Sequence, residues 1–169
     1  MPPHGSLHHQ GVPSTLTAHI VVRGAARAID FYRRAFGAVE ELRLTGPDGE
    51  IAHAELRFGD ALLYLNEESP DLDERSPESL GGAAASHHLY VGDADAAFAR
   101  VVSAGAIPRL RVEDMFWGER YGTVRDPFGY EWALATRTEV LTAAEIRARA
   151  QRLVESAAAG EQPQGVARA

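Results

Sequence analysis

The chain repeats one order of secondary structure, and this repeat constrains its fold more than any other feature. Residues 15–22 are β-branched, apolar and alternating, as in a strand, and Gly24 ends that strand. Residues 25–36 have apolar side chains at helical spacing, and Gly37 is suited to cap the helix. The patterns that follow predict strands over residues 39–44, 50–58 and 60–66.

The second half of the chain has the same order. It predicts a strand over residues 86–91, a helix over 94–104, a strand over 107–112 and a final hairpin. The hairpin turns at Asp126-Pro127-Phe128-Gly129, where proline and glycine suit a tight turn. Val22 aligns with Val91 and Gly37 with Gly105, so the two halves have nearly equal length. The repeat predicts an α+β fold of two β-α-β-β-β modules, whose uncovered sheet faces together enclose a shared cavity.

Composition shifts predict the boundaries of these units. The stretch between the modules is rich in serine, proline, glycine and acids, as in a linker or a loop over a pocket. A capping box at Thr142 and Glu145 predicts a further helix near the C-terminus. The expected units are a disordered tail (1–14), the first module (15–68), a linker or loop (69–85), the second module (86–137), a C-terminal helix (138–158) and a second disordered tail (159–169).

Charge and composition exclude several classes of partner. The formal net charge is −7 and no basic stripe is present, which argues against nucleic acid. No apolar run approaches the roughly 18 residues of a membrane span, and the first residues do not resemble a signal peptide. The absence of cysteine fits a reducing cytoplasm. We interpret His4, His8 and His9 as solvated tail residues rather than metal ligands.

Several motifs in order resemble one superfamily. AIDFYRRAFGA follows the first strand, and DPFGYEW precedes the last. Together with HAELRFGDALLYLNEE and DMFWGERYG, they resemble the vicinal oxygen chelate superfamily, which includes glyoxalases, bleomycin-resistance proteins and ring-cleaving dioxygenases, and within it the PhnB-like branch. The resemblance covers roughly residues 15–150. It implies eight strands around a cavity and a homodimer.

The resemblance also implies where a metal centre would lie. Metal enzymes of this superfamily place ligands on the first and fourth strands of each module. In this chain those positions fall on Thr17, on Leu63 or Tyr64, on Ser86 and on Ala133. None is a good ligand for a divalent ion. The favoured interpretation is therefore that the standard metal centre is absent.

A displaced metal site is the alternative. Residues two apart on a strand share a face, so His19, His88 and Glu131 share the faces of Thr17, Ser86 and Ala133. Two histidines and a carboxylate suit a divalent ion such as Fe, Mn, Ni or Zn. In the favoured interpretation these side chains only hydrogen-bond a ligand, and no cofactor is assigned. His87 is expected to point towards the helix side of its strand.

Other side chains are candidates for the cavity wall. His53 and Glu55 share a strand face and, with Tyr64, could line the first module; His53 is a candidate general base or merely contacts the next strand. Tyr90 has the parity of His88. An aromatic cluster before the hairpin either stacks on a flat ligand or belongs to the core: Phe116, Trp117 and Tyr121. Arg120 and Arg125 flank it and could meet an anionic group, although Arg125 could instead pair with Asp126.

These observations favour a binding protein for a small, partly aromatic molecule. Thr17, His19, Tyr64, Ser86 and Tyr90 would contact that molecule, with the aromatic cluster and Arg120. The alternative is a metal-dependent lyase, isomerase or oxygenase with the displaced His19, His88 and Glu131 set. A third hypothesis is an enzyme without metal, in which His88 or His53 acts as the base, so whether the chain is an enzyme stays open.

Overall fold

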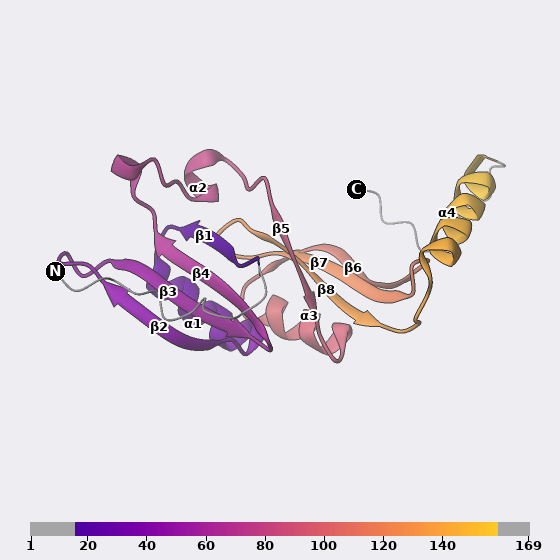
Figure 1. Ribbon diagram of the computed structural model, residues 1–169, viewed down its shortest axis with the longest axis horizontal. Helices are drawn as coiled ribbons and strands as arrows, with labels where there is room; N and C mark the ends of the chain where they lie inside the picture. Colours follow the sequence, from indigo (N-terminus) through magenta and orange to yellow (C-terminus); the bar gives the residue numbers. More distant parts are fainter. Residues whose placement is uncertain (1–15, 159–169) are drawn as a thin grey trace, which may run out of the picture.

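The computed structural model describes residues 16–158, and both predicted tails, including His4, His8 and His9, lie outside that range. The first module contains the strands and helix expected from the repeat (Figure 1). Its elements are β1 (Ala18–Val22), α1 (Ala25–Phe36), β2 (Val39–Thr45), β3 (Ile51–Phe58) and β4 (Ala61–Glu67). The second module repeats this order with β5 (Ser86–Tyr90), α3 (Ala94–Ser103), β6 (Ile107–Met115), β7 (Glu119–Arg125) and β8 (Glu131–Arg137).

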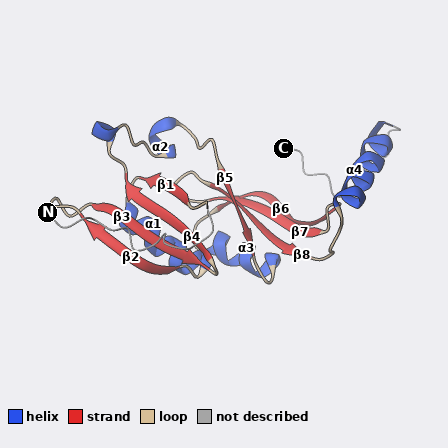
Figure 2. Cartoon of the chain, in the orientation of Figure 1, coloured by secondary structure: helices blue, strands red, loops and turns tan. Residues whose placement is uncertain are grey.

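Each module forms one four-stranded sheet, and the two sheets have the same topology. The strand orders are β1-β4-β3-β2 and β5-β8-β7-β6. The first strand of each sheet pairs in parallel with the fourth, and the remaining pairs are antiparallel. Figure 2 shows the two sheets side by side, with α1 and α3 along the same side of them. The α+β fold of two tandem modules is therefore confirmed.

Helix α1 has the amphipathic pattern that the sequence predicted. Ile29 and Tyr32 are fully buried, whereas Arg33 and Arg34 are exposed. The helix ends at Gly37, whose φ of 71° is left-handed and whose N–H bonds the carbonyl of Arg33. This packing covers one face of the first sheet and leaves the other face open.

An aromatic core joins the two modules on their helix sides. The Trp132 ring centroid lies 4.6 Å from that of Phe36 and 5.5 Å from that of Tyr32. Asp126, in the turn before β8, is buried and accepts hydrogen bonds from the Tyr32 hydroxyl (2.7 Å) and from Trp132 Nε1 (2.9 Å). Burial raises the pKa of the Asp126 carboxyl, and these hydrogen bonds oppose that rise. The modules therefore share a core, while their open faces remain free of helices.

The segment between the modules is more ordered than its composition predicted. It contains two short helices, η1 (Pro70–Leu72) and α2 (Pro77–Leu80). Glu68 accepts hydrogen bonds from Arg23, next to β1, and from the Ser76 backbone and hydroxyl. Hydrogen bonding by the Ser79 side chain, and then by Ser76 and Arg23, lowers the pKa of Glu68. The segment is thereby attached to the edge of the first sheet.

The C-terminal helix projects away from both sheets (Figure 1). Helix α4 (Ala143–Ala158) begins at the predicted capping box, and residues 138–142 before it form no helix or strand. The capping box is confirmed: Glu145 N–H donates to Thr142 Oγ1, and Thr142 N–H donates to Glu145. The helix buries none of its residues. Within residues 16–158, no helix is long and apolar enough to cross a membrane.

Candidate functional site

The candidate site residues lie mainly on the open faces of the two sheets. On β1, Ile20 and Val22 are buried against the helix side, so His19 points to the open side. On β5, His88 and Tyr90 are exposed, whereas His87 is partly buried on the helix side, as predicted. We call the open face of the first sheet the N-face and that of the second sheet the C-face.

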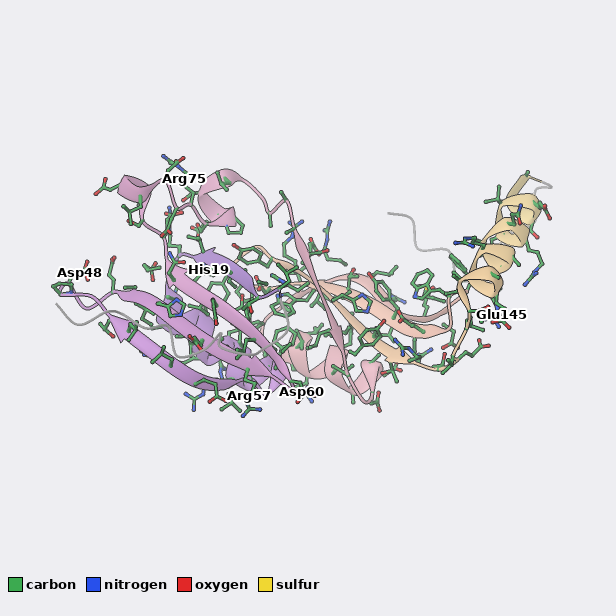
Figure 3. The ribbon with its side chains drawn as sticks, viewed as in Figure 1. His19, Asp48, Arg57, Asp60, Arg75 and Glu145 are labelled. Atoms are coloured by element: carbon green, nitrogen blue, oxygen red, sulfur yellow. The ribbon has the colours of Figure 1, made fainter. Side chains whose placement is uncertain are left out.

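Histidine, tyrosine and glutamate side chains meet on the N-face. Tyr64 pairs with His19 on one neighbouring strand and with Glu55 on the other. The His53 ring lies 5.0 Å from the Tyr64 ring and 6.0 Å from the His19 ring, and its Nε2 is 3.4 Å from Glu55 Oε1. Figure 3 labels His19 on β1. The predicted grouping of His53, Glu55 and Tyr64 is therefore present, with His19 beside it.

Glu119 organises the C-face. Its side chain is buried although it lies on β7 at the open side of the sheet. Tyr90 donates its hydroxyl to Glu119 Oε1 at 2.6 Å, and Trp117 donates Nε1 to Oε2 at 2.8 Å. His88 Nε2 is 3.9 Å from Oε2. The carboxylate thus holds two of the predicted binding residues, Tyr90 and Trp117, by hydrogen bonds, and His88 lies beside it.

Aromatic rings surround this carboxylate. The Tyr121 ring is 5.5 Å from that of Trp117 and 5.8 Å from that of His88, and the His88 ring is 4.8 Å from that of Tyr90. Burial raises the pKa of Tyr121, and the nearby charge of Glu119 raises it further. This arrangement offers ring faces and ring edges to a flat ligand.

Glu119 is not among the residues predicted from the sequence. The signal was available, because Glu119 has the strand parity of Tyr121 and follows Trp117 by two residues. What the pattern could not show is that Tyr90, on another strand of the sheet, reaches the same carboxylate. That contact depends on the order β5-β8-β7, which places the two residues near each other.

The predicted arginines do not contribute free cationic groups to the C-face. Arg120 points to the helix side and donates to Asp95 of α3 and to Asp114. These hydrogen bonds lower the pKa of Asp95 and raise that of Arg120. Arg125 donates to Glu131 at 2.8 Å. The alternative ion pair of Arg125 with Asp126 is therefore not formed. The Phe116 ring packs edge-to-face on Trp117 at 4.9 Å.

The family's metal positions hold no set of good ligands in this chain. Tyr64, rather than the buried Leu63, occupies the open side of β4 beside His19. Thr17 precedes β1, and Ser86 and Ala133 lie on β5 and β8. Within residues 16–158, no three His, Cys, Asp or Glu side chains are grouped closely enough to hold an ion. The residues of one chain therefore do not fit the standard metal centre.

The displaced set is also separated within one chain. His19 lies on the first sheet, whereas His88 and Glu131 lie on the second. The Glu131 carboxylate is already 2.8 Å from Arg125 and 3.5 Å from Arg109. A site that uses His19 with His88 would need side chains from two copies, so this set stays a prediction.

Both faces are open to solvent in the single chain. On the N-face, Leu42 pairs with Glu55 and Leu44 with His53, and these leucines are 39% and 51% exposed. On the C-face, Tyr90 is 54% exposed. Apolar and aromatic side chains with this exposure, beside hydrogen-bonding groups, are typical of binding surfaces.

Comparisons with known proteins agree with this architecture. The model of the Glyoxalase/Bleomycin resistance protein/Dioxygenase superfamily matches residues 8–134. The uncharacterised protein Mb0911c of Mycobacterium bovis is 44% identical over 140 residues, which cover 81% of this chain and 92% of that protein. The uncharacterised protein At5g48480 of Arabidopsis thaliana is 32% identical over 122 residues, which cover 68% of this chain and 73% of that protein.

Solved structures show the same likeness. The crystal structure of TioX from a Micromonospora species aligns with a TM-score of 0.57 and 28% identity, covering 74% of this chain and 99% of TioX. The X-ray structure of At5g48480 aligns with a TM-score of 0.60 and 27% identity, covering 73% of this chain and 99% of that chain.

Proposed function

This chain belongs to the glyoxalase/bleomycin resistance protein/dioxygenase superfamily, and we propose that it binds a small, partly aromatic molecule between the N-face of one copy and the C-face of a second. The supporting observation is that both faces are exposed in one chain and carry grouped aromatic and hydrogen-bonding side chains. A single face leaves a flat ligand half solvated, whereas two faces bury most of its surface.

The shared core supports this arrangement over closure within one chain. Trp132, Tyr32 and Asp126 fix the modules to each other on their helix sides. Turning the two open faces of one chain towards each other would expose this buried aromatic cluster. Adding a second copy closes both faces and leaves the core unchanged. The proposed assembly is accordingly a homodimer with two equivalent sites.

The donor set supports binding without the standard metal centre. The four family positions are Thr17, Tyr64, Ser86 and Ala133, which together offer two hydroxyl groups, one phenol and one methyl group. Neutral hydroxyls are poor ligands for Fe, Mn, Ni or Zn compared with imidazole and carboxylate. In the proposed dimer Thr17, Tyr64 and Ser86 contact the ligand directly.

One observation keeps the metal-dependent alternative in view. His19 and His88 occupy equivalent places in the two modules, each three residues before the paired valines Val22 and Val91, and each on an open face. When the N-face of one copy meets the C-face of the other, His19 of the first copy and His88 of the second would line the same cavity. Such a site would support lyase, isomerase or oxygenase chemistry.

Metal content separates the two functions. The protein without residues 1–10 is purified without a histidine tag, and its Fe, Mn, Ni and Zn contents are measured by inductively coupled plasma mass spectrometry. We expect less than about 0.1 ion per chain after incubation with each metal. A near-stoichiometric metal that disappears in the His19→Ala/His88→Ala variant would overturn the proposal and establish the displaced metal site.

A further inference from the structure

The carboxylate of Glu119 is buried with neutral hydrogen-bond donors on both oxygens. The residue is 7% exposed; the Tyr90 hydroxyl donates to Oε1 and Trp117 Nε1 donates to Oε2. Both donors are uncharged, so they do not neutralise the carboxylate. Each oxygen still has a lone pair that can accept a further hydrogen bond. Burying a carboxylate is costly unless a cation or further donors compensate it.

The ion pairs in the described part of the chain do not supply that cation. Within residues 16–158, no arginine pairs with Glu119, and its only basic neighbour among the ion pairs is His88 Nε2 at 3.9 Å. Arg137 lies opposite Glu119 in the β7–β8 register. Its guanidinium carbon instead lies 5.1 Å from the ring centroid of Tyr90. Neutral donors thus hold the carboxylate in place, and among residues 16–158 no guanidinium or ammonium group forms an ion pair with it.

The surrounding aromatic rings also favour a positively charged ligand. The rings of Tyr90, Trp117 and Tyr121 stand around the carboxylate, and the faces of such rings attract cations. Arg137 lies over a face of the Tyr90 ring, so a ligand cation would use the neighbouring rings of Trp117 and Tyr121. A negative group beside aromatic rings provides two attractions, ionic and cation–π, that a neutral ligand cannot use.

We propose that Glu119 and the rings of Trp117 and Tyr121 form a subsite for a positively charged group, so that the ligand of the C-face is an aromatic organic cation. A quaternary nitrogen or a protonated amine beside a flat ring system has the required chemistry. This inference rests on the proposed binding function and specifies its ligand class.

The test compares two probes that differ mainly in charge. N-methylacridinium is a permanent cation, whereas acridine is neutral at about pH 7.5. Both are titrated into the full chain by isothermal titration calorimetry at low and moderate salt. We expect N-methylacridinium to bind at least about tenfold more tightly than acridine, because only the cation gains ionic and cation–π contacts at this partly desolvated site.

Three variants identify the source of that preference. Glu119→Gln keeps the shape of the side chain and removes its charge, so the cation is expected to lose about tenfold in affinity while acridine is unchanged. Glu113→Gln removes an exposed charge near the same face and is expected to keep the preference. Tyr90→Phe keeps the charge of Glu119 but removes the hydroxyl that donates to it, so the affinity for the cation is expected to change less than in Glu119→Gln. Circular dichroism verifies that each variant is folded.

The outcomes separate the inference from the proposed function. Equal binding of both probes, or a preference that survives in folded Glu119→Gln, would overturn the cationic subsite and leave a small-molecule binding protein. An equal loss in Glu113→Gln and Glu119→Gln would also overturn it, because general attraction to an acidic protein would then explain the result. If neither probe binds, both the subsite and the proposed function for this ligand class are wrong.

Discussion

At the scale of single residues, Asp126 has a structural role that its place in a turn conceals. It accepts four hydrogen bonds, from the Tyr32 hydroxyl, Trp132 Nε1 and the backbone N–H groups of Phe128 and Tyr130. One carboxylate therefore fixes the turn and connects α1 to β8. The DPFG motif predicted the turn, but the contact with Tyr32, 94 positions away, required the fold.

Asp126→Ala is expected to destabilise the protein strongly. Four donors would lose their acceptor inside the shared core, so we expect the free energy of unfolding to fall by about 3 kcal/mol or more. Asp126→Asn should lose less, because its amide oxygen can still accept from the two backbone N–H groups, whereas Trp132 Nε1 loses its partner. Urea unfolding measures both variants. Asp60→Ala, at an exposed turn position, is the control and should change stability by less than about 0.5 kcal/mol.

His87 should make stability depend on pH. Its ring lies 4.6 Å from that of Trp132, its Nε2 is buried without a hydrogen-bond partner in the described chain, and burial lowers its pKa although the charge of Asp126 partly opposes this. The unfolded chain binds the proton more readily, with a pKa near 6.5. The contribution of neutral His87 to the free energy of unfolding is therefore complete above about pH 6.5. It is lost as the pH falls towards the folded-state pKa, by up to about 1.4 kcal/mol per pH unit.

The comparison of wild type with His87→Phe isolates this contribution. We expect the wild type to lose more stability than the variant between about pH 7.5 and pH 5.5 in urea unfolding. The contribution of Asp126 to the pH dependence of stability has the opposite sign, because its raised pKa favours the folded state as the pH falls. Asp126 is present in both proteins, so its contribution cancels in the comparison. Identical pH slopes in the two proteins would show that His87 is not the titrating group.

At the scale of elements, periodicity predicted the strands and helices but not what holds the segment between the modules. The boundaries of α1 were predicted to the residue, because its apolar spacing and Gly37 mark both ends. Residues 69–85 were interpreted as linker or loop, since serine, proline and glycine have no period. Their order comes from contacts with distant groups, such as Glu68 with Arg23 and α2 with the turn at Gly129. Such contacts leave no local pattern in the sequence.

Gly129→Ala tests the contact between α2 and the final hairpin. Gly129 has a φ of +91°, and a Cβ built there would lie 2.8 Å from Pro77 Cβ. Gly49 has a φ of +87° with no atom within 4 Å of such a Cβ, so Gly49→Ala measures backbone strain alone. We expect a loss of about 1 kcal/mol for Gly49→Ala and about 2–3 kcal/mol for Gly129→Ala in urea unfolding.

The same pair of variants has a structural readout. If α2 is displaced, limited proteolysis should cut residues 69–85 faster in Gly129→Ala than in Gly49→Ala. Equal losses of stability with equal cleavage rates would show that Pro77 moves aside without cost, and that the hairpin does not hold the segment.

At the scale of the whole molecule, the candidate site could be predicted only in part. Strand parity placed His19, His88 and Tyr90 on open faces, because alternation is a local property of a strand. Parity could not show that the two faces are exposed in one chain, since that follows from the aromatic core around Trp132. Helix α4 presents the same limit: its capping box predicted the helix, but nothing in the sequence showed that it would project away from the sheets.

The proposed dimer makes a quantitative prediction about mixed subunits. If the N-face of one copy and the C-face of the other form each site, a variant damaged on the N-face and a variant damaged on the C-face complement each other. His19→Ala/Tyr64→Ala and Trp117→Ala/Glu119→Gln are each expected to bind N-methylacridinium at least about tenfold more weakly than wild type. In a heterodimer of the two, one site is intact and the other carries both lesions. Random reassortment of equal amounts makes half of the dimers mixed, so about a quarter of the wild-type sites should return.

The measurement requires the two variants to carry different affinity tags and to be refolded together. Sedimentation velocity verifies that dimers form, and sequential purification isolates the heterodimer, in which about half of the sites should bind with wild-type affinity. Isolated heterodimers without any high-affinity site would show that both faces act within one chain. A protein that sediments as a monomer while saturated with ligand would contradict the dimeric site altogether, because each open face would then bind on its own.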